Sequence, residues 1–106
     1  PNAREKVAAL LWFALSAGRA HIEETTEIDW TQEFEVAADA FRKAHGDLLR
    51  EYVEEGMAAG EFAQGDSQLV ELMVGAMMLE YLVVVNADPN YSRDEELVER
   101  ILRFIG

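Results

Sequence analysis

The chain has 106 residues, half of them hydrophobic, which is enough for one small domain with a modest core. Nine Lys and Arg against 21 Asp and Glu give a net charge of −12, which opposes direct binding to nucleic-acid phosphates. The absence of Cys excludes disulfides and cysteine–zinc sites, and no secretory signal pattern is present, so we expect a cytoplasmic single-domain protein.

Apolar residues recur every three or four positions, and no alternating stretch rich in Val, Ile and Thr occurs, which predicts an all-α fold. The first helix is expected from Asn2 to Glu24. Its middle, Val7 to Ala17, is apolar except for one serine, so we expect this helix to be covered on most sides.

The second helix is expected to begin at a cap supplied by Asp29 or Thr31 and to continue to Ala59. Gly46 makes a kink or a break possible within it, because glycine is unfavourable in the middle of a helix. Gly60 is a natural left-handed stop.

The third helix is expected from a cap at Asp66 to about Asn86. Its two charges, Glu71 and Glu80, are nine residues apart and therefore lie on roughly opposite sides of the helix. Such a helix is expected to be buried on two sides, which one short chain can hardly provide. We therefore expect the second side to meet another subunit.

The fourth helix follows a turn at Ala87–Asn90 and is expected to begin with a capping box formed by Ser92 and Glu95. Together, the four main helices predict an antiparallel bundle whose last two helices form a four-helix interface in a homodimer. The residues expected at that interface are Leu72, Gly75, Leu79, Leu82, Leu97, Ile101, Leu102 and Ile105. Which flank of the third helix faces the partner stays open, since Leu69, Met73, Met77 and Val84 form a second apolar flank.

Motifs for catalysis, phosphate binding or metal coordination are missing, so no enzyme activity, cofactor or metal site is expected. Some polar residues nevertheless fall at positions where apolar ones are expected. One interpretation is that they are ordinary core residues or, for Glu80, lie at a subunit boundary. The other is that they anchor a small molecule in an apolar cavity. The candidate ligand-binding residues are Trp12, Phe13, His21, Phe41, His45, Met73, Met77, Glu80 and Tyr81.

The segment LREYVEEGMAAGEFAQGD, Leu49 to Asp66, contains a Gly56…Gly60-Glu61-Phe62 element. It is followed by an Asp-capped apolar helix, a turn and a final amphipathic helix. In this order of features, Leu49 to Ile105 resembles the C-terminal regulatory domain of tetracycline-repressor (TetR) family transcription regulators.

The resemblance implies that the last two helices pair with those of a second subunit and that the preceding helices enclose an effector cavity. The effector is expected to be a small, hydrophobic molecule. The family's helix-turn-helix domain is absent from this chain, so DNA binding is expected only through such a domain elsewhere. The alternative is a ligand-free, acidic helical adaptor that only dimerises.

Overall fold

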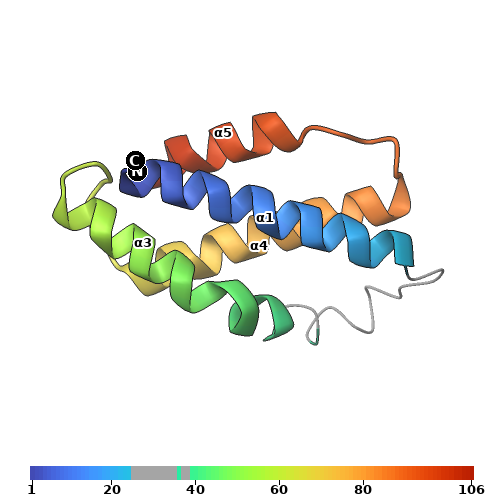
Figure 1. The fold of residues 1–106 in the computed structure, drawn as a ribbon, viewed down its shortest axis with the longest axis horizontal. Helices are drawn as coiled ribbons and strands as arrows, with labels where there is room; N and C mark the ends of the chain where they lie inside the picture. The colour runs from blue at the N-terminus through green and yellow to red at the C-terminus, as the bar shows by residue number, and fades with distance from the viewer. Residues whose placement is uncertain (25–35, 37–38) are drawn as a thin grey trace.

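Four α-helices run alternately up and down in chain order (Figure 1), in a computed structural model that describes residues 1–24, 36 and 39–106. They are α1 (Ala3–Glu24), α3 (Asp47–Ala58), α4 (Ser67–Ala87) and α5 (Asp94–Ile105). A short π-helical turn, η1 (Arg42–Gly46), leads directly into α3. The all-α prediction is confirmed for these residues, whereas the predicted caps Asp29 and Thr31 lie outside them.

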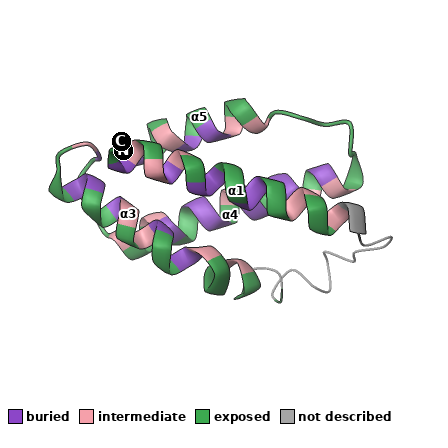
Figure 2. Cartoon of the chain, in the orientation of Figure 1, coloured by how far each residue is buried: buried purple, intermediate pink, exposed green. Residues whose placement is uncertain are grey.

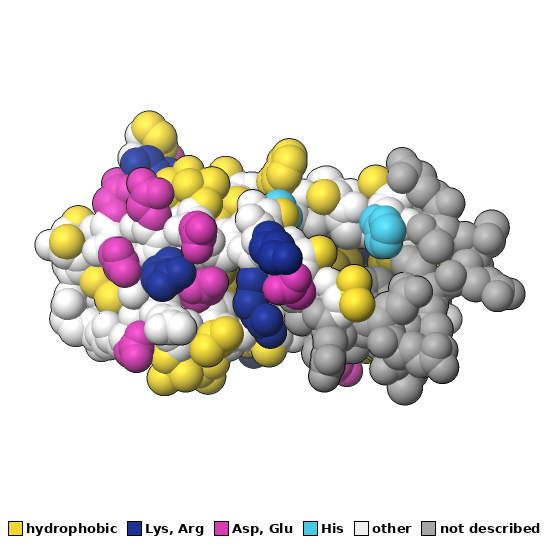
Figure 3. Space-filling model, turned by 90° about the horizontal axis from the view of Figure 1, so that it is seen from below, with side chains coloured by type: hydrophobic (Ala, Val, Ile, Leu, Met, Phe, Trp, Pro, Cys, Tyr) yellow, Lys and Arg dark blue, Asp and Glu magenta, His cyan; other side chains and the backbone are white. Residues whose placement is uncertain are grey.

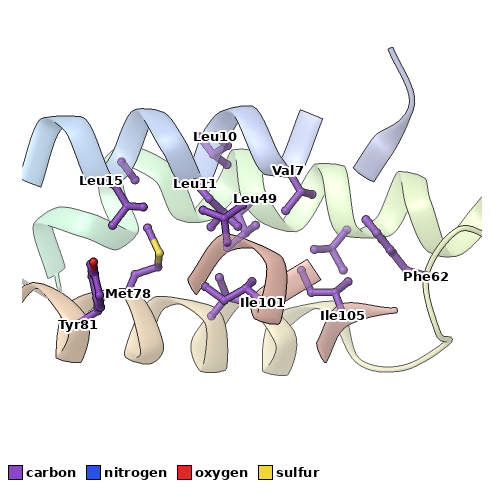
Figure 4. Close-up of a cluster of buried hydrophobic side chains, with 14 of the residues drawn as sticks. Val7, Leu10, Leu11, Leu15, Leu49, Phe62, Met78, Tyr81, Ile101 and Ile105 are labelled. Carbon is purple, nitrogen blue, oxygen red and sulfur yellow. The ribbon is translucent and has the colours of Figure 1, made fainter. Parts of the chain in front are cut away.

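Helix α1 occupies the centre of the bundle and packs against α3, α4 and α5. Its inner side buries Val7, Leu11 and Leu15 among side chains from the other three helices (Figure 4). Its outer side leaves Trp12 and Phe13 exposed. The expectation that this helix is covered on most sides therefore fails for the side that carries Trp12 and Phe13, which the described part of the chain leaves exposed.

The joint between α3 and α4 closes one end of the bundle. Gly60 has a φ of +77°, and the N–H groups of Glu61 and Phe62 both donate to the Gly56 carbonyl, so the predicted left-handed stop is confirmed. Phe62 is buried and lies at the same end of the core as Ile105 (Figure 4). The Glu61 carboxylate accepts a hydrogen bond of 3.0 Å from the N–H of Ala3, and the joint thereby also holds the start of α1.

Helix α4 begins at the predicted cap, where the Asp66 carboxylate accepts from the N–H groups of Gln68 and Leu69. One side of α4 is buried against α1 and α3, and its buried residues appear purple in Figure 2. The opposite side of α4 is exposed. By length and composition this helix could also cross a membrane, but 39% of its most apolar window is buried inside the protein. Glu71 lies on the buried side and Glu80 on the exposed side, as their spacing predicts.

Helix α5 does not begin with the predicted capping box, which we correct here. Its N-cap residue is Arg93, which makes no side-chain capping bond, and the helix starts at Asp94. The N–H of Arg93 instead donates to the Tyr81 hydroxyl at 2.7 Å. The start of α5 is thus fixed by a tertiary contact with α4 rather than by Ser92 and Glu95.

The π-helical turn η1 ends at Gly46, where the sequence indicated a kink. A Cβ atom at this position would lie 2.4 Å from Oε1 of Glu71 on α4. Gly46 therefore leaves room for the close approach of a buried carboxylate, and the extra residue of the π turn accompanies that approach.

Replacing Gly56 by alanine tests the joint between α3 and α4. Alanine ordinarily favours a helix over glycine by about 1 kcal/mol, but a Cβ here would lie 2.1 Å from the buried ring of Phe62. We expect Gly56→Ala to lower the free energy of unfolding by about 1–3 kcal/mol, measured by urea denaturation. Gly65→Ala is the matched control, because nothing lies within 4 Å of its added Cβ. A Gly56→Ala protein at least as stable as the parent contradicts this packing.

Candidate functional site

Three of the predicted ligand-binding residues form one aromatic cluster between α1 and η1. The His45 ring contacts Phe13 and Phe41 edge to face, with centroid distances of 5.9 and 5.2 Å. Partial burial lowers the pKa of His45, because the low-dielectric surroundings disfavour the charged ring. Phe13 and His45 also border an open groove of about 530 Å³ between α1 and α3. Figure 3 shows the face that carries α3, where hydrophobic side chains form several separate groups with acidic and basic side chains between them.

A smaller and more enclosed cavity, of about 80 Å³, lies between η1 and α4. Its one acidic wall is Glu71, which is only 8% exposed and whose Oε2 lies 3.2 Å from the Arg50 guanidinium. The apolar walls come from both elements and include Phe41, so this cavity adjoins the aromatic cluster. The lining residues are Phe41, Arg42, Gly46, Glu71, Leu72, Gly75, Ala76 and Leu79.

The other predicted ligand-binding residues lie elsewhere, so the expectation of one cavity walled by all nine is corrected. Trp12 lies beside the first turn of α5, and His21 is exposed near the end of α1. Met73 and Glu80 are exposed on α4. The physical reason is the helical period, which turns these residues toward different sides of α1 and α4.

Two further members of that set, Met77 and Tyr81, border a shallow groove between α4 and α5 together with Glu80 and Tyr91. Met77 is half-buried, while Tyr81 is buried and has its hydroxyl engaged in hydrogen bonds. This groove is open to solvent and lies on a different flank of α4 from the cavity beside η1.

A polar network beneath that groove joins α1, α4 and α5. The Tyr81 hydroxyl donates to Asp94, and Arg19 of α1 donates from Nε to the other oxygen of the same carboxylate at 2.9 Å. The Arg19 guanidinium, followed by the Tyr81 hydroxyl, holds the pKa of Asp94 below its ordinary value of 3.8 against the effect of burial. The network satisfies its polar groups internally, which indicates that it positions α5 rather than binding a ligand.

Most residues predicted for the dimer interface are buried in the single chain, and for these the prediction is corrected. Gly75 faces the ring of Phe41, and the buried Leu79 lines the cavity beside η1. Leu82, Ile101 and Ile105 lie in the core cluster that includes the inner side of α1. Leu97 and Leu102 are half-buried, and Leu72 is exposed.

The second flank of α4 supplies the exposed apolar surface instead. We define the outer face of α4 by residues that are all exposed: Leu69, Leu72, Met73, Ala76, Glu80 and Val84. Leu69 is 54% exposed and Met73 is 42% exposed. Met77 lies at the edge of this face.

Sequence reasoning did not assign a role to Glu71, the buried carboxylate of the cavity. The available signal was a charge within an otherwise apolar helix, and the same signal applied equally to Glu80. Periodicity placed the two residues on opposite sides but did not say which side faces η1 and Arg50. That choice follows only from tertiary packing.

Over the described part of the chain, no three His, Asp or Glu side chains come together in a way that would hold a metal ion. Comparison of the sequence and structure with protein-family models, curated proteins and solved structures finds no match. The candidate sites therefore have to be interpreted from their own geometry.

The Asp94 network predicts a stability loss at acidic pH. Because the folded pKa of Asp94 is depressed, its ionised form stabilises the fold above the unfolded pKa of about 4, and this contribution is lost as pH falls through the folded pKa. Asp94→Asn should lower the free energy of unfolding at neutral pH by about 1–3 kcal/mol and should weaken the dependence of that free energy on pH in the acidic range. The measurement is urea denaturation at several pH values from about 3 to about 7, a range that includes the unfolded pKa.

The control for this experiment is Glu95→Gln, which changes the same charge on an exposed neighbour in the first turn of α5. It should move stability by no more than about 0.5 kcal/mol. Equal effects of the two variants would show that Asp94 does not hold α5 in place.

Proposed function

We propose that this chain is the effector-sensing and dimerisation domain of a TetR-like transcription regulator and that it acts in the cytoplasm. The observation that carries the proposal is the outer face of α4. It is a continuous apolar surface on a long helix, interrupted only by Glu80, in a protein with a net charge of −12. Soluble proteins rarely leave such a surface uncovered.

Charge distribution supports a second copy of the chain as the partner of this face. More than a quarter of all residues are charged, yet the outer face of α4 carries one charge in six residues. The cores of subunit interfaces are depleted of charge in the same way. A two-fold axis beside α4 would pack two such faces together, with half-buried Leu97 of α5 at the margin, where it borders the same groove as Ala76, Glu80 and Val84.

The sensing half of the proposal is supported by the cavity between η1 and α4. Leu72 and Ala76 line this cavity and also belong to the outer face of α4. A molecule that prefers one arrangement of these residues would shift the population of dimer geometries, and an attached DNA-binding domain would respond.

The ligand-free adaptor is the second candidate, and the size of the cavity favours it. Ligand pockets typically measure about 300–1,000 Å³, whereas this one measures about 80 Å³. The sensing proposal therefore requires an effector that is small or that moves η1 away from α4. The adaptor requires neither.

Dimerisation is tested by light scattering coupled to size exclusion. The parent should have a mass of about 24 kDa, twice the 11.9 kDa of one chain. Met73→Glu combined with Val84→Glu places charges on the outer face and should give the monomer mass, since unpaired charge is costly at a buried interface. The matched control is Ala20→Glu combined with Ala58→Glu, at exposed positions of α1 and α3, and it should remain dimeric. A parent of 12 kDa (about one chain mass) at high micromolar concentration contradicts the proposal.

Sensing is tested by a thermal-shift screen with small hydrophobic compounds. A ligand that binds only the native state raises the melting temperature by about 4 °C or more for each kcal/mol by which it stabilises that state. Phe41→Ala enlarges the cavity and should change which compounds produce the shift. If the protein is a dimer but no compound raises its melting temperature saturably, the ligand-free adaptor is favoured.

A further inference from the structure

The cavity between η1 and α4 combines a buried carboxylate with apolar walls. Burial of an ionised carboxylate is costly unless a positive group compensates for it. The compensating group within the described residues is Arg50, whose Nε lies 3.2 Å from Oε2 of Glu71. The second oxygen, Oε1, is turned toward Gly46, which has no side chain to fill that space.

Arg50 is shared between two carboxylates. Its Nη2 lies 3.2 Å from Oδ1 of Asp47, whose side chain is 94% exposed, while its Nε faces Glu71. Arg50 therefore does not make the parallel two-point contact with Glu71 that gives the strongest arginine–carboxylate pairs. A competing cation at Glu71 would leave Arg50 with an existing partner at the surface.

We propose that this cavity binds the ammonium group of a small primary amine, with Glu71 as its counter-ion and Arg50 as the group that the amine displaces. This inference rests on the proposed sensing role of the same cavity and names the chemistry of its ligand. An alkylammonium ion presents three donors to a carboxylate and an apolar chain to Phe41, Leu72 and Leu79.

The volume limits the size of the amine. About 80 Å³ is roughly half of the 150 Å³ engineered cavity that accommodates benzene. A chain of a few carbons fits without rearrangement, and a longer one would extend past Leu72 and Ala76 toward the outer face of α4. Arg42 also borders the cavity, but the cation paired with Glu71 is Arg50, so Arg50 is the group with which the amine competes.

The test is an NMR titration of the 106-residue chain with propylammonium chloride, with 1-propanol as the neutral analogue and sodium chloride at matched concentrations. Propylammonium should shift the amide resonances of Gly46 and Gly75 saturably and bind at least about tenfold more tightly than propanol. Equal binding of the amine and the alcohol overturns the charge assignment while leaving the sensing proposal standing. No saturable shift with either probe overturns the site.

Two variants separate recognition by Glu71 from a merely structural role. Glu71→Gln should abolish the preference for the amine over the alcohol. Arg50→Gln removes the competing cation and should tighten amine binding and increase the rise in melting temperature that the amine produces. A purely structural ion pair predicts no gain in affinity, so unchanged or weaker amine binding by a folded Arg50→Gln protein contradicts the displacement.

Gly75→Ala provides a third variant that is compatible with folding. Its added Cβ would meet the Phe41 ring at 3.6 Å, an ordinary contact, and would occupy part of the cavity. It should weaken amine binding, and unchanged affinity would place the amine elsewhere. The mass of the protein in solution, measured separately by light scattering, reports on dimerisation. A monomer that binds propylammonium contradicts the proposed dimer but supports this site.

Discussion

The organisation of this protein depends on covering a helix that is apolar on nearly all sides. The chain supplies cover for one side of α4 through α1 and α3, and this contact forms one part of the core around α1. The outer face, including Leu69, Met73 and Val84, stays exposed within the part of the chain that the structure describes. Burial of apolar area is the main favourable term in folding and association, so the same property that builds the core also favours a partner on the outside.

The buried charge of Glu71 constrains the opposite flank of α4. A carboxylate there needs a cation, which Arg50 supplies, and space, which Gly46 supplies by lacking a side chain. The π turn of η1 occurs at the same place, as such turns frequently do at functional positions. Geometry and electrostatics thus converge on one small cavity, whereas hydrophobicity alone dominates the rest of the core.

The proposed ligand site and the proposed dimer interface share Leu72 and Ala76. Coupling between two sites requires an element whose arrangement both of them bias, and α4 meets this requirement because it borders both the cavity and the proposed dimer interface. The Arg19–Tyr81–Asp94 network fixes the far end of α4 to α1 and α5. Movement in response to a ligand is therefore expected nearer η1 than at that network.

The amino-acid sequence by itself determined the all-α class, the extents of α1, α4 and α5 within a few residues, the Asp66 cap and the Gly60 stop. These features depend on local periodicity and on backbone preferences that act within a few residues. Tertiary structure decided which flank of α4 is buried, why Glu71 rather than Glu80 faces the cavity, and why Tyr81 rather than Ser92 fixes the start of α5. The helical period places residues on opposite sides of a helix but does not say which of the two sides is buried. Contacts between residues that are distant in the chain decide this.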